Sequence, residues 1–238
     1  MLSLQILRLQ AQARAVRERN DLNELRSFVM TVLPRAVNKT KSHMDHFYIN
    51  MITQERIGTW NILTKRGLAR IVDEIRQLDG DMVSIASGSC FQERQMMEHF
   101  RAHGVGKEVI ATDLCAGDDM VSIGTPYMPR HVLDAADAPD AYPLCTMFYA
   151  SRLRKEFAVP FLQALLRVHP TGPLLIVLAG TDYVGEFGDE DGYDFSETRE
   201  FHQILAANGF TTEVVEGGLE DLPRGADDRD QLLIIKRA

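Results

Sequence analysis

The chain has 238 residues, of which 45% are hydrophobic and 25% charged, which is typical of a soluble globular protein with one substantial core. No apolar run approaches the roughly 18 residues that a membrane span needs, so we expect no membrane contact. The formal net charge of −8 argues against a nucleic-acid partner, because such partners require a basic face. The three cysteines, Cys90, Cys115 and Cys145, form no CxxC pair. This predicts a reducing compartment, and we expect a cytoplasmic protein.

The N-terminal third is predicted to be helical. Its first twenty residues are rich in Arg and nearly free of acids, which favours a surface helix, with an organelle transit peptide as the alternative. Apolar residues then recur at helical spacing over 22–33 and 68–78, and a further helical segment is expected around 46–52. We therefore assign residues 1–67 to a helical N-terminal extension or substrate cap, and residues 68–238 to one domain.

From residue 81 onward, short apolar runs alternate with longer helical segments. The predicted strands are 82–86, 108–112, 144–150, 173–179, 211–215 and 231–236, with a weaker one near 131–133. Helices are predicted over 91–103, about 152–169 and 195–208. In the first of these, the residues expected to face the core are Phe91, Met96, Met97 and Phe100. Such alternation favours a largely parallel sheet covered on both faces. The last two strands lack a helix between them, which suits an antiparallel closing pair.

A run of small residues, Ala86 to Cys90, follows the first predicted strand. In open α/β sheets ligands bind at the carboxyl ends of the strands, and a turn without bulk lets them approach the backbone N–H groups. Asp113 ends the next strand in "EVIATD", where a carboxylate can accept hydrogen bonds from the hydroxyls of a ribose. The fingerprint G-x-G-x-x-G would need glycines at 86, 88 and 91, and only Gly88 is present. A nicotinamide-dependent oxidoreductase is therefore disfavoured.

The stretch "VSIASGSCFQE", followed by "EVIATD", resembles the first two strands of the class I S-adenosylmethionine-dependent methyltransferases. The likeness extends over about residues 68–238 and includes "PLCTMFYA", "PLLIVLAG" and the ending "LLIIKRA". It implies an α/β, Rossmann-like methyltransferase fold with a helical N-terminal extension. The implied sheet has seven strands, mostly parallel, in the order 3-2-1-4-5-7-6, with an antiparallel last strand.

The loop departs from the family's usual G-x-G-x-G pattern. Ala86 replaces the first glycine and Cys90 the third, and Ser84 stands where many members carry an acid. A methyl group at position 86 is tolerated if φ is negative there, whereas Cys90 is costlier if its position needs a positive φ.

The resemblance implies S-adenosylmethionine as the cofactor, bound by the loop and by the ends of the first four strands. In this assignment the loop lines the methionine part, Asp113 holds the ribose, and Asp134 or Ala135 lies near the adenine. The residues assigned to the cofactor site are Ala86, Ser87, Gly88, Ser89, Asp113, Leu114, Asp134, Ala135 and Tyr149. No metal site is expected, because His43 and His46 lack further ligands at a suitable spacing.

Methyl transfer from a sulfonium needs alignment of donor and acceptor and, for a hydroxyl or protonated amine acceptor, a general base. The candidate catalytic residues are His46, Tyr183 and Glu186. The last two belong to an acidic segment that is either an anionic lid or a solvated loop. We expect methyl transfer to a small-molecule acceptor. The alternative is a catalytically silent methyltransferase-like binding or scaffold protein, and a homodimer is left open.

Overall fold

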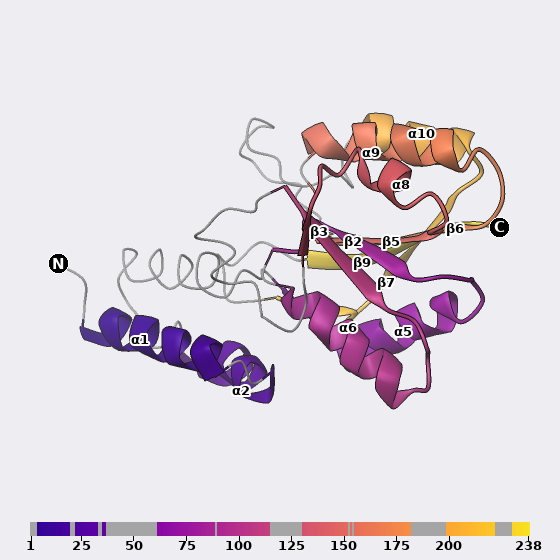
Figure 1. Cartoon of the computed structure of the whole chain (residues 1–238). Coiled ribbons are helices and arrows are strands. Elements are labelled where there is room, and N and C mark those ends of the chain that lie inside the picture. The colour runs from indigo at the N-terminus through magenta and orange to yellow at the C-terminus, as the bar shows by residue number, and fades with distance from the viewer. Residues whose placement is uncertain are drawn as a thin grey trace.

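A computed structural model describes residues 4–19, 22–32, 35–36, 61–88, 90–114, 130–151, 153, 155–181, 199–221 and 230–238. Two helices, α1 (Leu4–Arg19) and α2 (Leu22–Ser27), begin the chain, and α2 continues into a π-helical turn over Phe28–Val32. Figure 1 shows α1 and α2 at one side of the remaining elements. Buried residues of α1 recur every three or four positions, as the predicted surface helix requires; they are Ile6, Leu9, Ala13 and Val16.

The centre of the molecule is a seven-stranded sheet in the order β4-β3-β2-β5-β6-β9-β7. Its strands are β2 (Met82–Ile85), β3 (Val109–Asp113), β4 (Arg130–Val132), β5 (Met147–Ser151), β6 (Leu174–Thr181), β7 (Thr211–Val215) and β9 (Asp230–Arg237). When these strands are counted along the chain, the order is 3-2-1-4-5-7-6. All pairs are parallel except those of β9, which runs antiparallel to both β6 and β7. The predicted strand order and the antiparallel closing pair are confirmed.

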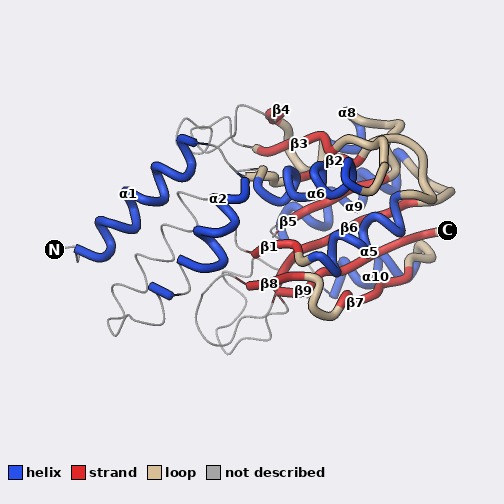
Figure 2. Tube along the Cα trace, turned by 90° about the horizontal axis from the view of Figure 1, so that it is seen from below, coloured by secondary structure: helices blue, strands red, loops and turns tan. Residues whose placement is uncertain are grey.

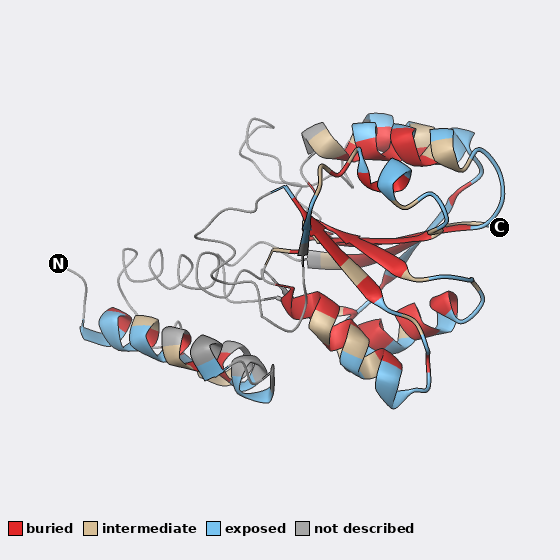
Figure 3. Ribbon diagram, in the orientation of Figure 1, coloured by how far each residue is buried: buried red, intermediate tan, exposed pale blue. Residues whose placement is uncertain are grey.

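Helices cover both faces of this sheet (Figure 1). One face carries α5 (Lys65–Ile75) and α6 (Phe91–Ala102), and the other carries α8 (Ala138–Ala141), α9 (Lys155–Val168) and α10 (Arg199–Ala207). Successive residues of a strand point to opposite faces. Met82 accordingly packs in the core on the α5–α6 side, and Val83 and Ile85 pack in the core on the α9–α10 side. The strands between these layers are buried along most of their length (Figure 3).

A second, two-stranded sheet was not predicted. Within it β1 (Asn61–Leu63) pairs antiparallel with β8 (Leu219–Asp221), and the two lie side by side in Figure 2. The adjoining α5 starts at Lys65, with Thr64 Oγ1 accepting a hydrogen bond from Gly67 N at 3.1 Å. A Cβ built on Gly67 would lie 2.2 Å from the Gly218 oxygen, so glycine permits the close approach of α5 to the turn before β8.

Several element boundaries differ from the predictions. The strand predicted over 144–150 begins at Met147, and Leu144 is 89% exposed. The helix predicted over 195–208 is α10 over Arg199–Ala207, and residues 195–198 lie outside the described residues. The segment expected around 46–52 lies outside the described residues. No helix in the described ranges is long and apolar enough to cross a membrane.

Candidate functional site

The loop after β2 turns the chain into α6 through left-handed backbone conformations. Ala86, Gly88 and Cys90 have φ values of +54°, +51° and +58°. Glycine adopts this region freely, whereas a residue with a Cβ is disfavoured there by about 1–2 kcal/mol. The condition under which Ala86 would be a mild replacement, a negative φ, is not met. Both departures from the glycine pattern therefore place side chains at strained positions.

Hydrogen bonds fasten this loop to the end of β3. The backbone N–H and the hydroxyl of Ser87 both donate to the Thr112 carbonyl, at 3.0 and 2.8 Å. Gly88 N donates to Asp113 Oδ2 at 2.8 Å, and Cys90 N donates to the Ser87 carbonyl at 2.7 Å. The structure thus brings Asp113 against the loop, as expected from the order of the strands.

Asp113 itself is nearly buried, with 8% of its surface exposed. A carboxylate offers about four acceptor positions, so its bond to Gly88 N does not by itself prevent it from accepting hydroxyl groups of a ligand. Leu114, the next residue, is 47% exposed. The carboxyl end of β3 therefore presents an acceptor and an apolar side chain beside the loop.

The end of β4 lies next to the end of β3. Leu133 N donates to the Asp113 carbonyl at 2.9 Å, and Asp134 follows directly. Asp134 Oδ1 accepts from Ala136 N at 2.9 Å, which closes a local turn. Ala135 is buried in the core on the α9 side of the sheet. Of these two residues, Asp134 is the partly exposed one.

Tyr149, the residue assigned from β5, is completely buried. Its hydroxyl donates to Gln92 Oε1 at 2.6 Å, so the side chain extends across the sheet face toward α6. The other assigned residues, Ser89 in the loop and the three candidate catalytic residues His46, Tyr183 and Glu186, lie outside the described residues. Their roles stay predictions.

Three polar residues in the first turns of α6 are buried, and the sequence analysis did not single them out. Gln92, Glu93 and Gln95 are 4%, 1% and 5% exposed. The expected core residues Phe91, Met96 and Phe100, which precede and follow them in the sequence, are buried, and Met97 is partly buried against the same core. A signal for Glu93 was present in Ser84, a polar residue within an apolar strand, because a buried hydroxyl needs a partner.

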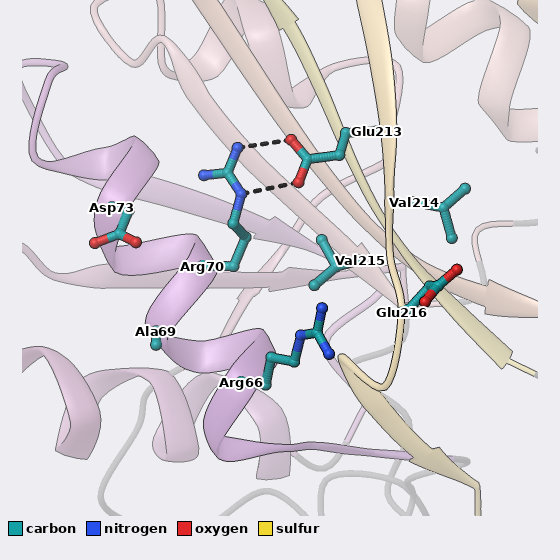
Figure 4. A pocket seen from close by; sticks show the side chains of 8 residues that line it. All are labelled: Arg66, Ala69, Arg70, Asp73, Glu213, Val214, Val215 and Glu216. Carbon is teal, nitrogen blue, oxygen red and sulfur yellow. Dashed lines mark hydrogen bonds and ion pairs between the residues drawn. The ribbon is translucent and has the colours of Figure 1, made fainter.

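A cavity of about 400 Å³ lies elsewhere, between α5 and β7 (Figure 4). On its wall the Arg70 guanidinium bonds Glu213 at 3.0 and 2.7 Å and also pairs with Glu74, which accepts from Lys236 Nζ at 2.8 Å. Burial raises the pKa of Glu74, but the hydrogen bonds from Lys236 and Arg70 outweigh it and hold that pKa below its usual 4.5. This cavity shares no residue with the loop. Among its lining residues, Arg70 and Glu213 form an ion pair.

The described ranges contain no group of three or more His, Cys, Asp or Glu side chains placed to hold a metal ion. His43 and His46 lie outside those ranges. Cys90 is completely buried at the start of α6, which does not suit a nucleophile that must reach a substrate.

Comparison with known proteins yields matches among solved structures alone. No family model and no curated protein matches the chain. The magnesium protoporphyrin IX methyltransferase from Synechocystis, solved with bound S-adenosylmethionine, is 12% identical, with coverage of 95% of this chain and 97% of that one and a TM-score of 0.46. An S-adenosylmethionine-dependent methyltransferase from Archaeoglobus fulgidus is 14% identical, with coverage of 80% and 100% and a TM-score of 0.46.

The methyltransferase domain of the citrinin polyketide synthase is 14% identical, with a TM-score of 0.46. The match covers 95% of this chain, which spans 65% of the length of that domain. The strand order 3-2-1-4-5-7-6 with an antiparallel β9 is the one that the resemblance of the sequence to the class I S-adenosylmethionine-dependent methyltransferases implied. The chain has this fold on the evidence of its own topology.

Proposed function

We propose that this protein is an S-adenosylmethionine-dependent methyltransferase that acts on a small-molecule acceptor. The observation that carries the proposal is the contact between the loop and Asp113, with Gly88 N 2.8 Å from Asp113 Oδ2. This contact lies at the carboxyl ends of β2 and β3, next to the point where the strand order reverses between β2 and β5. Open α/β sheets bind their ligands at such a point.

The residues present fit the cofactor in chemical type. The loop has small side chains, so a ligand can approach its backbone N–H groups, which suit the carboxylate of a methionine moiety. Asp113 supplies a carboxylate for vicinal hydroxyls. Leu114, which is 47% exposed, adds an apolar surface next to that carboxylate, and Asp134 adds an acceptor at the end of β4.

S-Adenosylmethionine, when bound, supplies an electrophilic methyl group on a positively charged sulfur. The task of this chain is to hold the acceptor in line with that group and to exclude water. A hydroxyl or protonated amine acceptor also loses a proton to a base, for which His46, Tyr183 and Glu186 are our candidates.

A catalytically silent binding protein with the same fold is the second candidate. One observation favours it: Ala86 and Cys90 hold left-handed conformations without being glycines. Both candidates permit a folded loop, but they differ in whether a sulfonium ligand binds there and reacts.

Calorimetric titration with S-adenosylmethionine and S-adenosylhomocysteine tests the proposal. We expect binding of both, and we expect Asp113→Ala to weaken it by about 1–3 kcal/mol because a buried charged acceptor is lost. Asp113→Asn is the matched control, since its amide oxygen can still accept from Gly88 N while the charge is removed. Absence of heat and of thermal stabilisation with either ligand at millimolar concentration would contradict the proposed function.

A further inference from the structure

The loop that joins β2 to α6 needs support from outside its own sequence. Two of its residues, Ala86 and Cys90, have side chains and positive φ values. Such conformations persist when the surrounding structure fixes them. Without that support the loop would relax toward backbone conformations with negative φ, and the direction of its N–H groups would change.

The first turns of α6 supply this support through three side chains that reach three different strands. Gln92 Oε1 accepts from Tyr149 Oη of β5 at 2.6 Å, and Glu93 Oε1 accepts from Ser84 Oγ of β2 at 2.5 Å. Gln95 bonds both backbone groups of Leu63 in β1, with Leu63 N to Gln95 Oε1 at 3.3 Å and Gln95 Nε2 to the Leu63 carbonyl at 3.4 Å. The start of α6 is accordingly buried (Figure 3).

Glu93 differs from Gln92 and Gln95 because its partner lies in the strand that leads into the loop. Its partner Ser84 lies one residue before the end of β2, and the loop leaves that strand two residues later, at Ala86. A hydrogen bond therefore joins the strand before the loop to the helix after it. With 1% of its surface exposed, Glu93 makes this bond away from water, where bonds to a carboxylate are strong.

We infer that Glu93 is a positioning residue, whose bond to Ser84 holds the loop in its left-handed, ligand-binding conformation in place of the two missing glycines. The inference rests on the proposed function, because ligand affinity is its readout. It also predicts a specific coupling. The loop should depend on Glu93 while positions 86 and 90 are Ala and Cys, and this dependence should fall when both are glycine.

The experiment is a double-mutant cycle between Glu93→Ala and the pair Ala86→Gly/Cys90→Gly, with S-adenosylhomocysteine affinity measured by calorimetry and the melting temperature measured in parallel. We expect Glu93→Ala to weaken binding about tenfold in the natural loop, in the range of coupling between residues in contact. In the glycine loop we expect the loss to shrink to about twofold or less. The melting temperature should fall in both backgrounds, because the buried bond is lost in both.

Two further variants define the controls. Glu93→Gln keeps an oxygen that can accept from Ser84, so we expect it to retain most of the affinity. Glu98→Gln makes the same chemical change at an exposed position of α6 and should leave affinity unchanged. If Glu93→Ala does not fold, Ser84→Ala breaks the same bond from the other side and enters the cycle in its place.

The outcomes separate the inference from the proposed function. An equal loss of affinity in the natural and glycine loops would overturn the inference, since Glu93 would then act on stability alone. Unchanged affinity in Glu93→Ala would overturn it as well. A natural chain that binds neither S-adenosylmethionine nor S-adenosylhomocysteine would instead remove the proposed function, and the inference with it.

Discussion

The two helical layers of the molecule are built from different kinds of contact. In the described part of the chain, the buried polar side chains that come from helices all belong to the α5–α6 layer, and they are Glu74, Gln92, Glu93 and Gln95. The opposite layer packs through apolar groups such as Phe148 and Phe161, whose rings meet edge to face with centroids 5.6 Å apart. Both layers have an apolar core, and the α5–α6 layer adds directional bonds to it.

This difference matches the positions of the layers relative to the loop. The chain passes from the loop directly into α6. Polar contacts at the start of α6 therefore fix the orientation of the loop's backbone as well as its distance from the sheet. Apolar packing supplies more free energy for each residue, but it tolerates changes of shape when volume is kept. We therefore expect substitutions in the apolar layer to lower stability most, and substitutions in the polar layer to alter ligand affinity.

Phe161→Ala should give the largest loss of stability. Phe161 is 1% exposed in the centre of α9, and truncation of such a side chain costs about 3–5 kcal/mol because it leaves a cavity. The free energy of unfolding in urea measures the loss. Leu144→Ala, at a position that is 89% exposed, should have little effect. A marked fall in ligand affinity of folded Phe161→Ala would show that the apolar layer also shapes the loop.

Tyr149→Phe should give an intermediate loss in the polar layer. It removes the hydroxyl that donates to Gln92 Oε1 at 2.6 Å, and the loss of one partner of a buried pair costs about 1–3 kcal/mol. The double variant Tyr149→Phe/Gln92→Leu removes both partners and should recover part of that stability. If the double variant loses as much stability as the two single variants together, the hydrogen bond between these residues contributes no coupling energy.

The sheet could be predicted from the sequence because its strands are apolar runs with a recurrent length. The order 3-2-1-4-5-7-6, implied by the resemblance, is the observed one. The β1–β8 pair was missed because three residues are too few to show a period. Its pairing joins Asn61 to Asp221, far apart in the chain, and neither residue is typical of a strand.

The candidate site was predictable where a strand end and a loop define it. The proximity of Asp113 to Gly88 followed from the parallel order of β2 and β3. The anchoring role of Gln92, Glu93 and Gln95 did not, because polar residues between Phe91 and Met96 look like the exposed face of an amphipathic helix. Their burial results from the position of α6 against the sheet and β1, which no helical period encodes.

Glu74→Gln should give the smallest of these losses, and its size should depend on pH. Glu74 is 10% exposed at its side chain and bonds both Arg70 and Lys236, so we expect a loss of about 1 kcal/mol at pH 7. Its folded pKa lies below the usual 4.5. The stabilisation is therefore complete above that pH and is lost as the pH falls through the folded pKa.

Urea unfolding of the natural chain and of Glu74→Gln at several pH values between 7 and 3 measures this dependence. The two stabilities should converge as the solution becomes acidic. Asp140→Asn is the matched control, because Asp140 and its partner Arg167 have side chains that are 47% and 63% exposed and such pairs contribute little in salt. Parallel curves for the natural chain and Glu74→Gln would mean that Glu74 stabilises the α5–β9 contact through its shape and not its charge. The contact of α5 with β9 would then depend on packing, as the contacts of the apolar layer do.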